Sequence, residues 1–287
     1  MTINQALAAA QSELVASGHP EAKLEAQLLL QHLLQVNRAW LIAHRHENLT
    51  PEKLTLFNNL VARRIKGEPI AYILGEREFY GLNFAVTPDT LIPRPDTETL
   101  VEAALSKIPQ HINAHILDLG TGSGAIALAI AKNRPQTQVT AIDASLAALA
   151  VAKKNAASLQ IYNVQFLMSN WFGALEHHRF DIIVSNPPYI ESADPHLAQG
   201  DLRFEPVTAL ASGADGLDDI RRIIDNCLLY LNPQGWLILE HGYNQAISVS
   251  DLMSAAGLVD VATIKDLSGN DRVTIGKNPL IVSTHWD

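Results

Sequence analysis

The tetrapeptide Asn186-Pro187-Pro188-Tyr189 holds the residue types with the most specific chemistry in this chain of 287 residues. Prolines fix the backbone and lack an N–H, so the neighbouring carbonyl groups stay available as hydrogen-bond acceptors. We expect Asn186 Oδ1 and the Pro187 carbonyl to accept the two hydrogens of a planar NH2 group. Tyr189 is expected to stack on the flat face of that group and to exclude water.

Such a pair of acceptors suits methyl transfer to an amide or amine nitrogen. An amide nitrogen is a poor nucleophile because its lone pair is delocalised, and two acceptors on its hydrogens raise its electron density. In-line displacement of a methyl group from a sulfonium then depends mainly on positioning. Asn186, Pro187 and Tyr189 are therefore the predicted catalytic residues, and with Pro188 they form the predicted substrate site.

A glycine loop, Gly120-Thr121-Gly122-Ser123-Gly124, is the predicted cofactor site, because it lies between a predicted strand (116–119) and a predicted helix (125–132). Glycine allows a ligand to approach the backbone N–H groups that open a helix. The third glycine follows the second by two residues, one fewer than in the dinucleotide-binding fingerprint. This spacing favours S-adenosylmethionine, which has no pyrophosphate, over NAD.

Three side chains near predicted strand ends complete this cofactor site. Asp143 is expected to accept hydrogen bonds from both ribose hydroxyls, the alternative being an N-cap for the helix that begins at Leu146. Asp118 is expected to pair with the ammonium group of the cofactor, directly or through water, or to have a structural role. Trp171 is expected to stack on or edge the adenine, or to pack in the core.

Strands and helices alternate after residue 112, which predicts parallel strands joined by crossover helices. The predicted strands span residues 116–119, 139–142, 164–167, 181–185 and 236–240. Residues 262–266 and 272–276, with a turn at Gly269-Asn270, predict an antiparallel hairpin at the sheet edge. The predicted fold class is α/β, a Rossmann-like class I methyltransferase sheet with an antiparallel C-terminal hairpin.

The chain is predicted to hold two domains and a connector. Residues 1–75 are expected to form a small N-terminal helical domain, with a helix start at Thr50-Pro51-Glu52. Residues 76–95 are expected to form a β-hairpin and an extended linker, and residues 96–287 the methyltransferase domain. Arg63, Arg64 and Lys66 precede Gly67, where they complement the helix dipole or form a patch that docks a protein substrate.

Composition and charge exclude several classes of protein. Hydrophobic residues make up 47% and charged residues 18%, which is typical of a globular protein. The net charge of −9 argues against a general affinity for nucleic acid. Cys227 is the only cysteine, which excludes an intrachain disulfide and favours a reducing cytoplasmic setting, with the thiol buried on a helix. Neither a signal peptide nor a membrane span is expected.

The histidines are not expected to bind metal. His44, His46 and the pair His177-His178 lack nearby cysteines and the helical His-plus-Glu spacing of zinc sites, so they are assigned to loops. His241 follows the strand predicted at 236–240, and we expect a hydrogen-bonded structural histidine in preference to a proton acceptor.

The chain resembles the protein-(glutamine-N5) methyltransferases of the HemK/PrmC family, which modify peptide chain release factors. The resemblance spans nearly the whole chain and rests on residues 67–75, 91–98, the glycine loop, 185–190, 203–206, 239–242 and 269–273. It implies a helical N-terminal domain, a connecting hairpin, and S-adenosyl-L-methionine as methyl donor with S-adenosyl-L-homocysteine as product.

The resemblance also implies the substrate and the contacts. The substrate would be the glutamine of the Gly-Gly-Gln motif in class 1 release factors, held by Asn186-Pro187-Pro188-Tyr189. The cofactor would contact the glycine loop, Asp143, Trp171 and Asn186. The sequence departs from the family at Asn170, where an acidic residue is frequent, so this position offers an amide in place of a carboxylate.

Two other functions compete with this interpretation. An adenine-N6 nucleic-acid methyltransferase could use the same tetrapeptide on the adenine amino group, but it would need a basic target-recognition domain, and residues 1–75 are nearly neutral. A non-catalytic adaptor would not need the glycine loop, Asp143 and the tetrapeptide together. We therefore expect a monomeric enzyme with a release factor as partner and no direct nucleic-acid binding.

Overall fold

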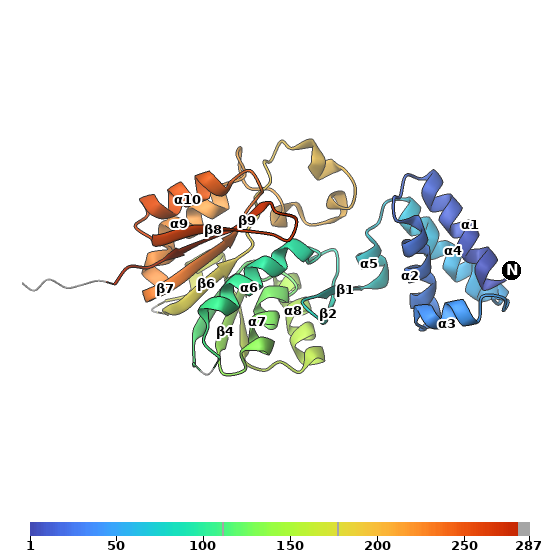
Figure 1. Cartoon of the computed structure of the whole chain (residues 1–287), viewed down its shortest axis with the longest axis horizontal. Helices are drawn as coiled ribbons and strands as arrows, with labels where there is room; N and C mark the ends of the chain where they lie inside the picture. The colour runs from blue at the N-terminus through green and yellow to red at the C-terminus, as the bar shows by residue number, and fades with distance from the viewer. Residues whose placement is uncertain (111, 177, 281–287) are drawn as a thin grey trace, which may run out of the picture. The chain divides into compact units, whose positions relative to one another are not determined.

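The computed structural model describes residues 1–110, 112–176 and 178–280, and the chain divides into two compact units (Figure 1). Unit 1 comprises Met1–Glu76 and the separate segment Gln199–Phe204, and unit 2 comprises Arg77–Ala198 and Glu205–Asp287. Among the described residues, no helix is long and apolar enough to span a membrane.

Unit 1 is a bundle of helices. They are α1 (Ile3–Ala16), α2 (Ala22–Leu34), α3 (Arg38–Ala43), α4 (Pro51–Ile65) and α5 (Ile70–Leu74). The start signal predicted at Thr50-Pro51 is confirmed, because the Thr50 side chain accepts from Lys53 N at 3.3 Å and proline occupies the first turn. Apolar faces of the helices meet around Leu14, Leu29 and Phe57, which are fully buried.

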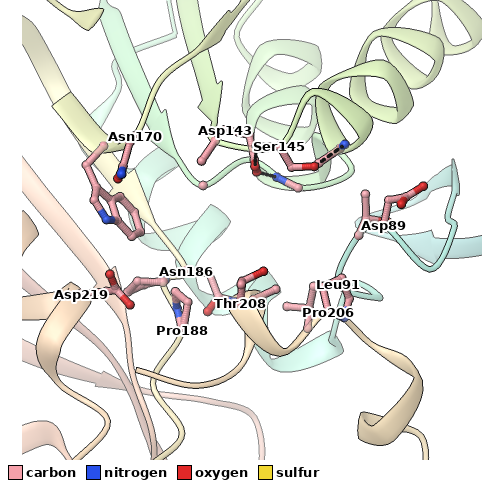
Figure 2. Close-up of a pocket in the computed structure, with 18 of the residues that line it drawn as sticks. Asp89, Leu91, Asp143, Ser145, Asn170, Asn186, Pro188, Pro206, Thr208 and Asp219 are labelled. Atoms are coloured by element: carbon pink, nitrogen blue, oxygen red, sulfur yellow. Dashed lines mark hydrogen bonds between the residues drawn. The ribbon is translucent and has the colours of Figure 1, made fainter. Parts of the chain in front are cut away.

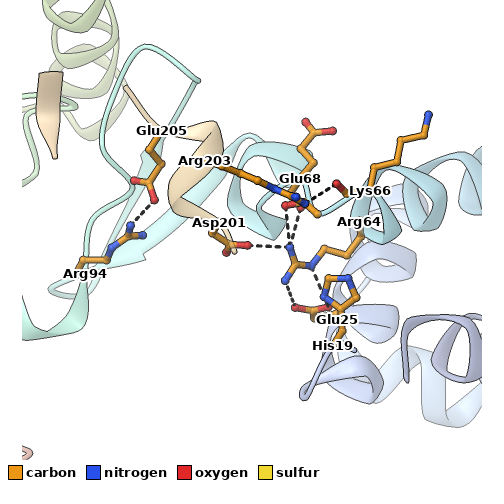
Figure 3. A network of polar contacts seen from close by, with 10 residues as sticks. His19, Glu25, Arg64, Lys66, Glu68, Arg94, Asp201, Arg203 and Glu205 are labelled. Atoms are coloured by element: carbon orange, nitrogen blue, oxygen red, sulfur yellow. Dashed lines mark hydrogen bonds and ion pairs between the residues drawn. The ribbon is translucent and has the colours of Figure 1, made fainter. Parts of the chain in front are cut away.

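Arg64 is buried in unit 1, at 7% exposure (Figure 3). Its guanidinium donates to Glu25 through Nε (3.1 Å) and Nη2 (2.9 Å), and through Nη1 to Asp201 Oδ1 (3.0 Å). Arg63 pairs with Glu68. The prediction of a docking patch is therefore wrong for Arg64, because its charge is already neutralised by carboxylates in the same unit.

The segment Gln199–Phe204 is held on unit 1 by a second arginine as well. Arg203 Nη2 donates to the Lys66 carbonyl at 2.8 Å. Gly67 has φ +92°, and a Cβ placed there would lie 1.7 Å from Arg203 Nη2. Gly67 is thus favoured by its backbone conformation, and a larger residue there would also displace the end of the Arg203 side chain from the Lys66 carbonyl.

Unit 2 contains a seven-stranded sheet with the order β5-β4-β3-β6-β7-β9-β8. Its strands are β3 (His115–Leu119), β4 (Gln138–Asp143), β5 (Val164–Met168), β6 (Phe180–Ser185), β7 (Leu231–Glu240), β8 (Val259–Lys265) and β9 (Asp271–Lys277). The strands β3 to β7 run parallel, and β9 pairs antiparallel with both β7 and β8. The predicted α/β sheet with an antiparallel C-terminal hairpin is confirmed.

Helices cover both faces of this sheet (Figure 1). On one face pack α6 (Glu98–Lys107), α7 (Ala125–Asn133) and α8 (Leu146–Leu159), and on the other α9 (Asp218–Tyr230) and α10 (Ala246–Ala255). Side chains alternate along a strand, so Ile116 faces the first core and Leu117 the second. Cys227 is fully buried on α9, as predicted.

A two-stranded hairpin, β1 (Glu76–Phe79) and β2 (Leu82–Ala85), precedes the sheet. Its turn residues Tyr80 and Gly81 both have positive φ, as tight hairpin turns require. Asn155 on α8 fixes the hairpin, accepting from Ala85 N (2.8 Å) and donating to the Ala85 carbonyl (3.0 Å), while its Nδ2 also donates to Ser123 O (2.9 Å). One buried amide therefore joins the hairpin to the glycine loop.

The strand order reverses direction between β3 and β6. From β3 the chain continues outward to β4 and β5, whereas β6 leads to β7 on the other side. Leu119 at the end of β3 pairs with Ser185 at the end of β6, and Ser185 Oγ donates to the Leu119 carbonyl at 2.7 Å. Ligands of open α/β sheets bind at the carboxyl ends of strands at such a switch point.

Candidate active site

A cavity of about 690 Å³ opens at this switch point (Figure 2). That volume is in the range of small-molecule and cofactor sites. Its walls come from the glycine loop, from the ends of β4 and β6, from the residues after β5, and from two chain segments, 88–91 and 206–211. The predicted site residues that line it are Gly120, Gly122, Asp143, Trp171, Asn186, Pro187 and Pro188.

The glycine loop is tightly built. Gly120, Gly122 and Gly124 all have positive φ, of 74°, 56° and 83°. A Cβ at Gly124 would lie 3.1 Å from Leu128 and 3.2 Å from Ala152, so this glycine permits α7 to pack on α8. A Cβ at Gly122 would meet nothing within 4 Å, so this residue presents bare backbone to the cavity. Such a surface fits a ligand that approaches the backbone closely.

Asp143 lies at the end of β4 and joins the loop to the next helix. Its Oδ2 accepts from Gly122 N at 2.9 Å, and its Oδ1 accepts from Ser145 N at 2.8 Å. The N-cap of α8 is Ser145, whose side chain accepts from Ala148 N. The alternative assignment of Asp143 as the helix N-cap is therefore wrong. Each carboxylate oxygen keeps a further lone pair, which could accept a hydroxyl of a ligand.

Trp171 lines the same cavity as Asp143 and begins the short 3-10 helix Trp171–Ala174 after β5. Its φ of +51° is a left-handed conformation that costs energy for a non-glycine residue, and such outliers cluster at functional sites. The nearest atom to a Cβ at Gly120 would be Trp171 Cζ3, at 3.7 Å. The indole lines the cavity and also packs against the core, and its contact with the adenine stays a prediction. Asn170 is exposed and lines the same wall.

Asp118 is fully buried beneath the loop. Its Oδ2 accepts from Thr121 Oγ1 at 2.6 Å, and Oδ1 has no partner in ordinary hydrogen-bond geometry among the described residues. Burial raises the pKa of this carboxyl to about 7, against the lowering effect of the Thr121 hydroxyl. An unpaired buried oxygen below a glycine loop fits a site that receives a cationic group.

Asn186 lies directly after β6, with Pro187 buried behind it. Asn186 Nδ2 donates to Thr97 Oγ1 at 3.2 Å, at the junction of the short 3-10 helix Pro95–Thr97 and α6. In the described part of the chain, no group donates to Asn186 Oδ1 or to the Pro187 carbonyl. Both acceptors that the sequence predicts are thus free of protein partners, and both residues line the cavity.

Tyr189 does not line the cavity. Its hydroxyl donates to Glu240 Oε1 at 3.3 Å, and burial together with the Glu240 charge raises the pKa of this phenol. Its carbonyl accepts from Gln245 Nε2 at 3.0 Å, and a Cβ at Gly216 would lie 2.2 Å from that carbonyl oxygen. The backbone at Tyr189 is therefore held by Gln245 and by the close approach of Gly216. Stacking of Tyr189 on a substrate stays a prediction.

Glu240 ends β7 and is buried, at 1% exposure. Burial raises the pKa of its carboxyl to about 7, while the Thr97 hydroxyl, the Arg272 charge and the Tyr189 hydroxyl lower it. Arg272 is held by Asp266 (3.2 Å) and Asp96 (3.3 Å). A charged cluster thus lies directly behind the tetrapeptide.

After the tetrapeptide, the chain turns away at Ile190 and comes back to the cavity at residues 206–211. Ile190 pairs with Ala211, and residues 206–211 form part of the wall. Buried Glu205 holds this return against the 88–95 segment by accepting from Ile92 N (3.0 Å) and by pairing with Arg94 (Figure 3). This part of the cavity wall is therefore fixed by a partly buried ion pair.

Sequence reasoning missed several residues that position the site. Thr97, Asn155 and Gln245 contact the loop or the tetrapeptide from 30 or more residues away, which no local pattern reveals. Glu205 acts at one remove, by binding the 88–95 segment. Gly216, with φ +74°, was detectable only as a glycine in a turn-rich stretch. Thr121, Ser123 and Gly124, assigned to the cofactor, support the loop from outside the cavity lining.

His241 is a structural histidine, as predicted. It is fully buried, with Nε2 2.8 Å from Thr274 Oγ1 and Nδ1 2.9 Å from the Gly242 carbonyl. A carbonyl only accepts, so Nδ1 carries the proton, and burial lowers the pKa of the ring. His44 bonds the Trp40 carbonyl, His178 the Glu176 carbonyl, and His177 lies outside the described residues. Within the described residues no cluster of potential metal ligands occurs.

Comparison with known families agrees with this geometry. Residues 5–75 match the family described as the PrmC N-terminal domain, and residues 96–202 match the methyltransferase small domain. The matched ranges cover the helices of unit 1 and the cofactor half of unit 2.

Several relatives are similar over nearly their whole length. The release factor glutamine methyltransferase of Xylella fastidiosa (strain Temecula1) is 51% identical over 257 residues, 90% of this chain and 94% of that protein. The release factor glutamine methyltransferase of Escherichia coli (strain K12) is 46% identical over 266 residues, 93% and 95% of the two chains. A methyltransferase structure from Pyrococcus furiosus shares the fold, with a TM-score of 0.54, 19% identity, and coverage of 78% and 100%.

Proposed function

This chain belongs to the release factor glutamine methyltransferase family, and from that premise we propose the reaction of its site. The enzyme transfers a methyl group from S-adenosyl-L-methionine to the side-chain amide nitrogen (N5) of the glutamine in the Gly-Gly-Gln motif of class 1 release factors. The observation that carries the proposal is the pair of unpartnered acceptors, Asn186 Oδ1 and the Pro187 carbonyl, beside the glycine-loop cavity.

The residues present fit the cofactor. Gly120 and Gly122 leave backbone exposed, Asp143 offers lone pairs for ribose hydroxyls, and Trp171 offers an aromatic surface for adenine. Asp118 supplies a buried carboxyl group beneath the glycine loop for the amino-acid end. When bound, S-adenosylmethionine supplies an electrophilic methyl group on a sulfonium.

The protein acts mainly by positioning the nucleophile. Asn186 Oδ1 and the Pro187 carbonyl each accept one hydrogen of the glutamine NH2 group, which fixes its plane and raises electron density on nitrogen. Pro188 and Tyr189 keep the segment rigid, Tyr189 through its contacts with Glu240 and Gln245. The nitrogen proton becomes acidic once the methyl group has transferred, so no strong general base is needed. Effective molarity from such alignment supplies most of the rate.

We assign the domains and partners accordingly. Residues 1–75 form the helical domain that docks the release factor, residues 76–95 the hairpin and linker, and residues 96–287 the methyltransferase domain. The enzyme works as a monomer in the cytoplasm, where release factors act, and does not bind nucleic acid directly.

The reaction is tested with purified protein, labelled S-adenosylmethionine and a purified class 1 release factor. We expect label in the release factor and none in a factor whose Gly-Gly-Gln glutamine is replaced by alanine. A parallel reaction with duplex DNA tests the adenine-N6 alternative. Label in DNA alone, or in neither substrate, would contradict the proposal.

Asn186→Ala tests the acceptor assignment in the same assay. Loss of one positioned hydrogen bond to the reacting group is expected to lower kcat by about 100-fold or more. The melting temperature should stay close to that of the wild type, because Asn186 is half-buried and its side chain bonds only Thr97 among the described residues. Full activity of this variant would remove Asn186 from the mechanism.

A further inference from the structure

The short segment that presents the Pro187 carbonyl is anchored at both ends. Upstream, Ser185 ends β6 and is paired with a neighbouring strand on each side. Downstream, the Tyr189 carbonyl accepts from Gln245 Nε2 at 3.0 Å. The rings of Pro187 and Pro188 fix two of the backbone rotations in between, so a shift of the Tyr189 carbonyl is passed on to the Pro187 carbonyl.

Gln245 joins three chain segments through one buried amide. Its Nε2 donates to the carbonyls of Tyr189 (3.0 Å) and Asp215 (3.3 Å), and its Oε1 accepts from Gly242 N at 2.8 Å. Gln245 is 8% exposed, so bulk water hardly competes for these bonds. The tetrapeptide, the loop before α9 and the turn after β7 therefore share one anchor.

The backbone partners of Gln245 permit only one orientation of its amide. A main-chain N–H only donates and a carbonyl only accepts, so Gly242 fixes Oε1 and the two carbonyls fix Nε2. Rotated by half a turn, the amide would place a donor against a donor and an oxygen against two carbonyl oxygens. The direction of the bond to Tyr189 is therefore independent of the protonation of any side chain.

Gly216 leaves room for this bond. A Cβ at Gly216 would lie 2.2 Å from the Tyr189 carbonyl oxygen and 2.8 Å from Gln245 Nε2. Both distances are shorter than van der Waals contact, so a side chain at this position would displace the carbonyl from the amide. The same carbonyl is thus held by Gln245 and exposed to displacement at Gly216.

We propose that Gln245 is a positioning residue for methyl transfer, which holds the Tyr189 carbonyl and thereby sets where the Pro187 carbonyl meets the substrate amide. This inference rests on the proposed function. Gln245 does not line the cavity, so it acts through the tetrapeptide. Its loss misaligns the substrate nitrogen, and a misplacement of about 1 Å can lower a rate by about 100-fold.

Other contacts keep the segment folded when the Gln245 side chain is removed. The Tyr189 hydroxyl donates to Glu240 Oε1 at 3.3 Å, and Ile190 N donates to the Leu210 carbonyl at 2.9 Å. These bonds hold the phenol ring and the residue after the tetrapeptide, but neither involves the Tyr189 carbonyl. We therefore expect a loss of position without a loss of the fold.

The test replaces Gln245 by methionine, which has a similar length but no amide, and measures methylation of a release factor. Gln245→Met should lower kcat about tenfold or more, while the KM for the release factor and the Kd for S-adenosylhomocysteine stay within about threefold. Gly216→Ala should show the same split, because it displaces the same carbonyl. The double variant should lose less than the product of the two separate losses.

Amide hydrogen exchange reports on the anchor without any turnover. Gly242 N donates to Gln245 Oε1, so exchange at Gly242 should become faster in Gln245→Met. Exchange at Ile190 should become faster as well, because its N–H belongs to the same peptide group as the Tyr189 carbonyl. A variant that loses kcat while both amides exchange at the wild-type rate would contradict the proposal.

Two variants serve as matched controls. Asn278 is 7% exposed, and its Nδ2 also donates to two backbone carbonyls, those of Leu231 and Asn232 (both 3.1 Å), where β7 begins. The active site lies at the opposite end of β7, so Asn278→Leu should lose stability and keep kcat. Gly81→Ala matches Gly216→Ala, because φ is also +74° but nothing lies within 4 Å, and it should keep kcat.

The proposal is overturned if Gln245→Met keeps the wild-type kcat, if its loss lies in KM or in cofactor affinity, or if Asn278→Leu loses kcat equally. If Gln245→Met does not fold, Gly216→Ala and its control Gly81→Ala decide by the same measurements. A wild-type enzyme that methylates no release factor would overturn the proposed function, whereas hydrogen exchange would still report whether Gln245 holds Tyr189. The two failures are therefore distinguishable.

Discussion

Gly122 N donates to Asp143 Oδ2 at 2.9 Å, so the glycine loop and the end of β4 already form one surface in the protein itself. A ligand that needs both a bare backbone and a carboxylate meets them in fixed positions. Preorganisation of this kind lowers the ordering cost of binding.

Asp143→Ala should therefore weaken cofactor binding on two counts. The variant loses the acceptor for ribose hydroxyls and releases the Gly122 N–H. We expect the Kd for S-adenosylhomocysteine, measured by calorimetry, to rise at least about tenfold. Asp251→Ala removes an equal charge from an exposed position of α10 and should leave the Kd unchanged. Equal Kd values for the two variants would exclude Asp143 from the cofactor site.

Gly124→Ala should destabilise the protein by about 1–3 kcal/mol, measured by denaturant unfolding. The loss of stability has two causes. Alanine is strained at a φ of +83°, and its Cβ would lie 3.1 Å from Leu128 and 3.2 Å from Ala152. Gly269→Ala is the matched control, because φ is +86° there and nothing lies within 4 Å. The difference between the two variants measures the contact of α7 with α8, and no difference would show that backbone strain alone matters.

Arg64→Met should destabilise unit 1 by about 3 kcal/mol, because Glu25 would remain buried without its partner. Arg63→Ala, which breaks the more exposed pair with Glu68, should cost about 1 kcal/mol or less. Limited proteolysis within residues 1–76 reports the difference. Equal protease resistance of both variants would contradict the buried ion pair.

Asp118→Asn should gain stability over the wild type as pH rises. The folded pKa of Asp118 is about 7, above its unfolded value of about 3.9, so the folded state holds the proton more tightly. The stability that this proton contributes is complete below the unfolded pKa and is lost as pH rises through the folded pKa. The difference in melting temperature between variant and wild type should be larger at pH 8 than at pH 5. If the difference in melting temperature does not depend on pH, the pKa of Asp118 is not raised in the folded protein.

Much of the sheet was predictable because local patterns mark it. The predicted strand 116–119 differs from β3 by one residue, since an apolar run ends at a glycine. The predicted strand 236–240 begins five residues later than β7, because Asn232-Pro233-Gln234-Gly235 is typical of a turn. In the folded chain Leu231 pairs with Phe180 across a register shift, a pairing that sequence alone does not contain.

The contacts that orient the site were less predictable, because no local pattern marks them. Asn186 was recognisable from its own motif, but its partner Thr97 lies 89 residues earlier in the chain. Arg64 had the position of a surface charge in a last helical turn, and only Glu25, 39 residues away, reveals its burial. Long-range polar pairs depend on the completed fold, whereas helix starts and glycine loops are set by adjacent residues.

The membership of Gln199–Phe204 in unit 1 has a consequence for biosynthesis. The apolar core of this unit draws on residues 3–73 and can collapse soon after they emerge from the ribosome. Arg64 and the Lys66 carbonyl, however, meet Asp201 and Arg203 only after residue 203 has been translated. Until then the helical bundle has Glu25 as a partner of Arg64 but lacks Asp201, and a fragment that stops at residue 76 would leave Arg64 Nη1 without this carboxylate.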